Sequence, residues 1–144
     1  MLKGSCLCGS VRYTITGEVS DFGYCHCTSC RKASGTAHGA NIGVYRQDLE
    51  LSDPNQFSKE YESSPGKFRV FCSHCGSPLF AYLKSNHDVV RIRLGTLDTP
   101  LGKTAKAHTF MDENPDWHQV EDSLPQFNTW PDKDVLVQIG SKQT

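Results

Sequence analysis

The sequence predicts a small, mainly β, loop-rich domain that is held together by metal ions. Short apolar segments alternate with turn residues along a chain of 144 residues, which is typical of strands joined by short loops. No amphipathic pattern longer than about three helical turns is visible. Seven cysteines lie within residues 6–75, and small β domains often need such metal ligands to supplement a limited core.

In the first half of the chain, the pattern predicts two strands and a short helix. Apolar and polar residues alternate over 11–16 until Gly17, which predicts a half-buried strand. Residues 22–24 form an extended lead-in to the next cysteine, and residues 29–34 form one or two helical turns that end at Gly35. Residues 37–44 form a glycine-containing strand that permits close backbone approach.

The second half of the chain contributes further strands and one long ordered loop. Residues 67–72 are a predicted strand, and residues 78–83 and 89–94 form a hairpin joined through 85–88. Residues 106–110 form another strand. Residues 115–131 form a loop that packs Trp117, Phe127 and Trp130 onto the sheet. We expect one zinc-binding domain over 1–134 and a tail over 135–144.

Charge and hydropathy exclude two broad classes of function. The chain has 15 Lys and Arg against 16 Asp and Glu, a net charge of -1, which argues against a nucleic-acid binder that neutralises phosphates. Its longest apolar run is far shorter than the roughly 18–20 residues of a membrane span. The first five residues run directly into Cys6 and have no signal-peptide pattern, so we expect a reducing, cytoplasmic location.

The cysteine spacing predicts two metal sites. Seven is an odd number, so a complete disulfide framework does not account for these residues. Cys6-Leu7-Cys8-Gly9 and Cys72-Ser73-His74-Cys75-Gly76 both end in Cys-Gly, and a glycine after a ligand pair can take the positive φ of a metal knuckle. Together the two motifs supply four thiolates, Cys6, Cys8, Cys72 and Cys75, which is the closed set of a structural zinc.

The remaining cysteines, Cys25, Cys27 and Cys30, leave a fourth metal position open, as catalytic zinc sites do. In a rival assignment, His26 completes a four-ligand set with them. Neighbouring side chains of an extended segment point to opposite sides, which favours Cys25 and Cys27 over His26. The plainest alternative is three disulfides and one free thiol, which needs an oxidising compartment.

A zinc ion with three thiolate ligands suits chemistry at sulfur better than hydrolysis. Thiolates quench the charge of the metal, so a bound water is less acidified than at a tri-histidine site. An incoming small thiol, with a free pKa of about 8.5, can lose its proton there and be held as thiolate. Arg31 and Lys32 follow directly; they either attract a carboxylate of that thiol or are solvated surface cations.

With these motifs in view, the sequence resembles the glutathione-dependent formaldehyde-activating enzyme family, which includes centromere protein V. The resemblance covers nearly the whole chain. It rests on Gly4-Ser5-Cys6-Leu7-Cys8-Gly9-Ser10-Val11, on Cys25-His26-Cys27-Thr28-Ser29-Cys30-Arg31-Lys32-Ala33-Ser34-Gly35, on Phe71-Cys72-Ser73-His74-Cys75-Gly76-Ser77-Pro78-Leu79, on Gly95-Thr96-Leu97-Asp98 and on Leu124-Pro125-Gln126-Phe127.

The resemblance implies the small twisted β-sheets of the Mss4-like (β-tent) fold and two zinc ions per chain. It implies a structural zinc at Cys6, Cys8, Cys72 and Cys75 and a catalytic zinc at Cys25, Cys27 and Cys30. The implied activity is that of a carbon–sulfur lyase joining formaldehyde and glutathione into S-hydroxymethylglutathione, with glutathione or another small thiol as the partner. The alternative is a non-catalytic zinc module that mediates protein interaction.

The histidines outside these motifs allow two interpretations each. His38 stands where many family members carry an aromatic residue, so it is either a general base for an incoming thiol or an ordinary strand histidine. His108 and His118 flank the acidic loop 112–116; they either border a pocket or are exposed loop residues, and the second is the expectation.

Overall fold

The computed structural model describes residues 1–140, and their contacts form two compact units. The first unit contains residues 1–20 and 42–102 together with the described residues from 138 onward. The second unit contains residues 21–41 and 103–137. The last four residues of the predicted tail, 141–144, lie outside the described residues.

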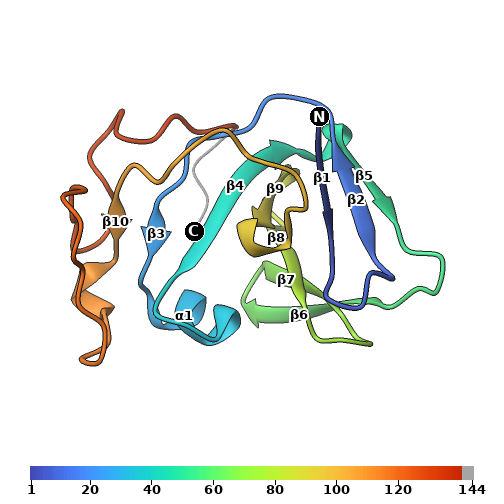
Figure 1. Ribbon diagram of the computed structural model, residues 1–144, viewed down its shortest axis with the longest axis horizontal. Coiled ribbons are helices and arrows are strands. Elements are labelled where there is room, and N and C mark those ends of the chain that lie inside the picture. Colours follow the sequence, from blue (N-terminus) through green and yellow to red (C-terminus); the bar gives the residue numbers. More distant parts are fainter. Residues whose placement is uncertain (141–144) are drawn as a thin grey trace. The chain divides into compact units, whose positions relative to one another are not determined.

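In the first unit, a three-stranded antiparallel sheet places β2 (Arg12–Ile15) between β1 (Leu2–Ser5) and β5 (Leu49–Ser52), as Figure 1 shows. Gly4 pairs with Tyr13 in this sheet, and a Cβ on Gly4 would overlap the Tyr13 ring. The glycine therefore lets the ring cross β1, where its hydroxyl lies 2.6 Å from Thr96 Oγ1. The short β1 segment leads directly into the first cysteine pair.

The same unit holds a larger sheet in the order β4–β9–β8–β7–β6. Its strands are β4 (Gly39–Tyr45), which enters from the second unit, β6 (Ser58–Ser64), β7 (Lys67–Cys72), β8 (Pro78–Leu83) and β9 (Asn86–Arg93). Two 3₁₀ turns, η1 (Arg46–Asp48) and η2 (Leu94–Thr96), follow β4 and β9. Apolar side chains of β4, β8 and β9 form the centre of the core, with Ile42, Leu79 and Ile92 fully buried.

The second unit is built around the two residues of β3 (Tyr24–Cys25). This strand pairs antiparallel with the first residues of β4 and parallel with β10 (His108–Thr109), as seen on the left of Figure 1. Helix α1 (Thr28–Ser34) follows β3, and the 3₁₀ turn η3 (Met111–Glu113) follows β10. The unit contains little regular structure, and many of its backbone hydrogen bonds join loop segments, such as the bond from the Met111 amide to the Phe127 carbonyl at 3.0 Å.

The predicted fold class is confirmed: the chain is mainly β with small sheets, and residues 1–140 contain one short α-helix. The predicted strands over 67–72 and 78–83 coincide with β7 and β8, and those over 11–16, 37–44, 89–94 and 106–110 exist with shifted ends. The strands β1, β5 and β6 were not predicted. The expectation that the loop 115–131 packs its tryptophans onto the sheet is wrong for Trp117, which is 65% exposed. Across residues 1–140, no helix combines the length and apolar character needed to cross a membrane.

Candidate metal centres

The first cysteine cluster lies in the first unit, where two similar turns bring four sulfur atoms together. Gly9 and Gly76 both have a left-handed φ, of 77° and 81°. Their amides donate to the carbonyls of Cys6, at 3.0 Å, and Cys72, at 2.7 Å. Each turn therefore closes on itself just after its second cysteine, as a metal knuckle does.

The sulfur geometry of this cluster fits a tetrahedral zinc ion. All four Sγ atoms, those of Cys6, Cys8, Cys72 and Cys75, lie within 4.8 Å of one another. The Cys6–Cys8 and Cys8–Cys72 sulfur pairs are 3.5 and 3.9 Å apart. Zn–S bonds of about 2.3 Å at tetrahedral angles require separations of about 3.8 Å. No disulfide is formed among these free thiols.

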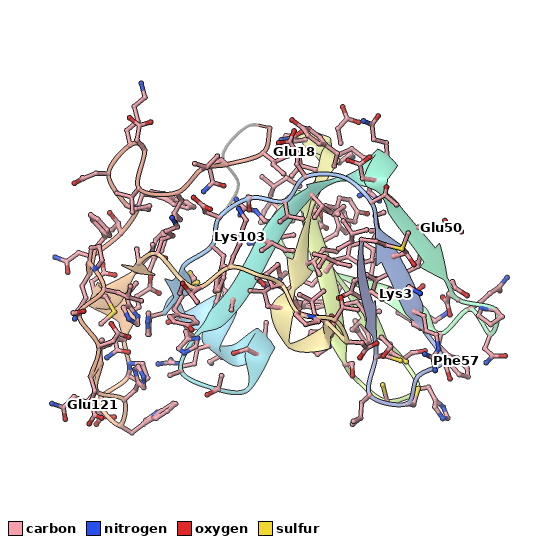
Figure 2. All side chains as sticks on the ribbon, turned by 45° about the horizontal axis from the view of Figure 1, so that its top comes forward. Lys3, Glu18, Glu50, Phe57, Lys103 and Glu121 are labelled. Atoms are coloured by element: carbon pink, nitrogen blue, oxygen red, sulfur yellow. The ribbon has the colours of Figure 1, made fainter. Side chains whose placement is uncertain are left out.

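The surroundings of the cluster shift the pKa values of two of its thiols in opposite directions. Burial raises the pKa of Cys72 to about 11, whereas Cys75, whose Sγ lies 3.4 Å from Ser77 Oγ, has its pKa lowered to about 5 chiefly by that hydroxyl. The same Ser77 oxygen accepts the amide of Leu7 at 2.8 Å, so it links the two turns. Phe57, labelled in Figure 2, stacks on His74 of the second turn at 4.7 Å between ring centroids.

The second cysteine cluster lies entirely in the second unit, at the junction of β3 and α1. The sulfur atoms of Cys25, Cys27 and Cys30 lie within 4.8 Å of one another. Cys27 is the N-cap of α1, and its Sγ accepts the amide of Cys30 at 3.3 Å. Gly35, with a φ of 75°, ends the helix, as the sequence predicts. The neighbouring Cys27 and Cys30 side chains raise the pKa of Cys25.

A glycine on β4 makes room for this cluster. Gly39 pairs with Cys25 across the sheet. A Cβ at Gly39 would stand 3.3 Å from Cys30 Cβ and 3.6 Å from Cys30 Sγ. The strand can therefore lie directly against the buried Cys30, which is 8% exposed, and the second cluster depends on the absence of a side chain at this position.

His26 does not join the three sulfur atoms as a fourth ligand. Its Nε2 lies 2.8 Å from His108 Nδ1, and among the described residues the converging metal-ligating atoms form only the four-cysteine and three-cysteine groups. The rival set of Cys25, His26, Cys27 and Cys30 therefore has no geometric support. Within residues 1–140, the second group has three protein ligands and one tetrahedral position left for a further group.

Three histidines gather around His26, all within the second unit. Ring centroids of His38, His108 and His118 lie 5.1, 5.0 and 5.3 Å from that of His26. His108 is 3% exposed, which contradicts the expectation of an exposed loop histidine. Its burial follows from the parallel pairing of β10 with β3, a long-range contact for which the sequence has no local signal.

Burial and charge repulsion disfavour the charged forms of His26 and His38. Desolvation lowers the pKa of His26 to about 4, helped by the neighbouring histidines, and burial likewise lowers the pKa of His38. At the edge of the group, the Asp122 carboxylate lies 2.9 Å from His108 Nε2, and that hydrogen bond lowers the pKa of Asp122. No pattern in the sequence marks Asp122 as a partner of His108.

A protein-family model matches most of the chain. The family model described as glutathione-dependent formaldehyde-activating enzyme matches residues 1–113, a range that includes both clusters. The chain belongs to this family. The resemblance stated from the sequence motifs is thereby confirmed.

Two curated relatives of this glutathione-dependent formaldehyde-activating enzyme family member span nearly its whole length. A protein of Halomonas elongata named "Putative glutathione-dependent formaldehyde-activating enzyme" is 28% identical over 145 residues, covering 94% of this chain and 92% of the relative. An uncharacterized lyase of Schizosaccharomyces pombe is 22% identical over 125 residues, covering 87% of this chain and 89% of the relative.

A crystal structure of a Rhodobacter sphaeroides protein has a similar fold. Its TM-score is 0.58 at 22% sequence identity, and the match covers 74% of this chain and 99% of that chain. At this level of identity the likeness concerns the fold alone. The family match and the lyase-named relative together favour an enzymatic role for this family member.

Proposed function

We propose that this protein is a zinc-dependent carbon–sulfur lyase-type enzyme acting on the adduct of glutathione, or another small thiol, with formaldehyde. The supporting observation is the contrast between the two cysteine clusters. Four sulfur atoms complete one site, whereas three sulfur atoms in the other leave one tetrahedral position for a substrate sulfur. The family match and the name of the Halomonas relative support glutathione and formaldehyde as the substrates.

In the proposed reaction, the sulfur of the thiol adds to the carbon of formaldehyde. One S–C bond forms and the π bond of the carbonyl breaks, so that its electron pair moves to oxygen. The thiol proton is lost and one proton is gained by that oxygen, which gives a hydroxymethyl thioether; the reverse reaction releases thiol and aldehyde. Zinc, when bound, would favour the thiolate form of the substrate because it lowers the pKa of a sulfur ligand.

The residues around the second cluster have separate roles in this proposal. Cys25, Cys27 and Cys30 hold the metal, and the backbone of α1 fixes Cys27 through its capping hydrogen bond. Arg31 and Lys32 in the last turn of α1 supply positive charge for a carboxylate of glutathione. Cys6, Cys8, Cys72 and Cys75 hold the second zinc and stabilise the first unit.

A cobalt-substituted protein tests this assignment directly. Millimolar glutathione should change the ligand-field spectrum of cobalt in the three-cysteine site, because a fourth sulfur ligand joins the metal. The matched control is Cys27→Ser, which should lose that response and retain the spectrum of the four-cysteine site. An unchanged spectrum in the wild-type protein would contradict the enzyme proposal and favour the alternative, a zinc module for protein interaction.

The wider setting of the proposal follows from the same chemistry. The seven cysteines, which form no disulfide in the described part of the chain, need a reducing compartment to stay available as metal ligands, and this supports a cytoplasmic location. The near-neutral net charge of -1 supports a small-molecule substrate over nucleic acid. The single zinc-binding domain over 1–134 with a tail over 135–144 stays a prediction.

A further inference from the structure

The segment that carries the second cysteine cluster donates a regular series of hydrogen bonds to the segment around β10. The amide of Tyr24 donates to the Ala107 carbonyl at 2.9 Å, and the amide of His26 donates to the Thr109 carbonyl at 3.0 Å. Every second amide of an extended chain points to the same side. The next amide in this series is therefore that of Thr28, the residue after the ligand at position 27.

The acceptor for the Thr28 amide is a side chain, because the backbone beside it turns away. Phe110, directly after β10, has a left-handed φ of 55°, which a bulky residue rarely adopts. The turn η3 follows, and the Glu113 amide closes it by donating to the Phe110 carbonyl at 3.1 Å. Glu113 Oε1 accepts the amide of Thr28 at 3.2 Å. The carboxylate thus continues the series of hydrogen bonds where the strand β10 ends.

This contact holds the first turn of α1, which carries two of the three sulfur ligands. Thr28 is the first residue of α1, so its amide has no acceptor inside the helix. The Cys27 sulfur accepts the amide of Cys30 at 3.3 Å, and Glu113 accepts that of Thr28. The first turn of α1 contains no acidic residue. Glu113 therefore supplies, from a distant part of the chain, the negative charge that a helix N-terminus favours.

The contact reaches Cys27 through a single peptide unit. The amide of Thr28 and the carbonyl of Cys27 belong to the same planar group. The Arg31 amide donates to that carbonyl at 2.9 Å, so the plane is held at both ends. Holding the plane fixes the ψ of Cys27, which is 153°, and with it the direction in which the side chain leaves the backbone. Metal–ligand distances tolerate changes of only about 0.2 Å, and groups that orient a ligand contribute to metal affinity.

We propose that Glu113 is a positioning residue of the three-cysteine site: it fixes the peptide plane between Cys27 and Thr28 and thereby strengthens metal binding there. Glu113 touches neither the metal nor the substrate in this role. The inference rests on the metal assignment within the proposed function and is independent of the identity of the thiol. Because an exposed carboxylate is screened by solvent, the hydrogen bond carries the effect, and the neutral acceptor of Glu113→Gln should serve nearly as well.

Amide NMR of zinc-loaded, nitrogen-15-labelled protein tests the hydrogen bond itself. The Thr28 amide proton should exchange with water about threefold to tenfold faster in Glu113→Ala than in the wild type, because one net hydrogen bond is lost. Glu113→Gln should retain the slow exchange. Asp112→Ala, which removes the neighbouring exposed carboxylate of η3, is the matched control and should also retain it. Equal exchange rates in the wild type and Glu113→Ala would overturn the proposal.

Competition with a chelator tests the effect on the metal. In Glu113→Ala the affinity for the second zinc ion should fall about threefold to tenfold, the range of one net hydrogen bond. The first zinc ion, in the four-cysteine site, and the circular dichroism spectrum should stay unchanged. Glu113→Gln and Asp112→Ala should both remain within about twofold of the wild type. A loss in Glu113→Gln as large as that in Glu113→Ala would contradict a role carried by the hydrogen bond.

A double-mutant cycle separates this positioning from general support of the loop. Thr28→Pro removes the donor, and proline is favoured at the first position of a helix because it needs no acceptor there. The extended ψ of Cys27 suits a following proline. Adding Glu113→Ala to Thr28→Pro should change the affinity for the second zinc ion by less than about twofold. An equal loss in both backgrounds would show that Glu113 acts through another contact and would overturn the proposal.

The two proposals fail in distinguishable ways. If the wild-type protein binds no second zinc ion, the metal assignment of the proposed function fails, and the role of Glu113 fails with it. If the wild type binds the second ion and Glu113→Ala binds it equally well, the positioning role alone fails and the proposed function stands.

Discussion

Replacing Cys75 with serine should unfold the protein, whereas replacing Cys27 with serine should leave it folded. Cys75 belongs to the closed set of four sulfur atoms that joins two turns far apart in sequence, with Cys8 and Cys72 separated by 64 positions. Binding of a structural zinc contributes about 10–16 kcal/mol to the folding of small zinc domains. A chain of 144 residues has a total stability of about 7–22 kcal/mol, at 0.05–0.15 kcal/mol per residue. Loss of the structural zinc therefore removes most or all of the stability.

The Cys27→Ser variant is a matched control because serine preserves the local structure. Cys27 caps α1 by accepting the Cys30 amide, and serine is a preferred N-cap residue that accepts the same hydrogen bond. We expect its melting temperature to change by less than about 5 °C. Circular dichroism melting and size-exclusion chromatography of both variants, purified with zinc, provide the comparison. Equal destabilisation of the two variants would refute the division into a structural and a working site.

Three further predictions concern the packing and the charges. Gly4→Ala should lower the free energy of unfolding by about 1–3 kcal/mol, because its Cβ would overlap the buried Tyr13 ring. Gly95→Ala, with open space around it, is the control. Equal denaturant midpoints for the two variants would contradict the close packing of Gly4 against Tyr13. Gly39→Val should crowd Cys30 and reduce the zinc content by up to one ion per chain without unfolding the first unit; an unchanged content by elemental analysis would count against it. Asp21 has its pKa lowered below its ordinary value of 3.8, first by the Val137 amide and also by Lys103. The ionised Asp21 therefore stabilises the fold above about pH 4, and this contribution is lost as the pH falls through the lowered pKa. Asp21→Asn should accordingly be destabilising at pH 7 and nearly neutral near pH 2. If the difference in free energy of unfolding between the variant and the wild type does not shrink as the pH falls, this reasoning is refuted.

Local patterns predicted the parts of the structure whose causes are local. The one or two helical turns predicted over 29–34, with their end at Gly35, correspond to α1 because that end is determined by a nearby glycine; the N-cap at Cys27 was not predicted. The two Cys-Gly endings predicted the turns of the first cluster because a positive φ at Gly9 and Gly76 is a property of the turn itself. The grouping of the cysteines into four and three followed from the spacing and the family resemblance.

Features that depend on long-range pairing could not be predicted from local sequence patterns. β5 and β6 carry mostly exposed residues. β5 alternates over only four residues and β6 contains one apolar side chain, so their strand structure depends on pairing with β2 and β7. The burial of His108 depends on pairing with β3. The hydrogen bond of Asp122 depends in turn on the position of His108. Neither residue stands at a spacing that marks it in the sequence.

Zinc per chain, measured by elemental analysis on protein reloaded with zinc and freed of excess, tests the central claim most directly. The account predicts two zinc ions per chain in the wild-type protein and one in folded Cys27→Ser, since one site has four sulfur ligands and the other has three. A wild-type protein that holds only one zinc ion after reloading would contradict the presence of a working metal at Cys25, Cys27 and Cys30.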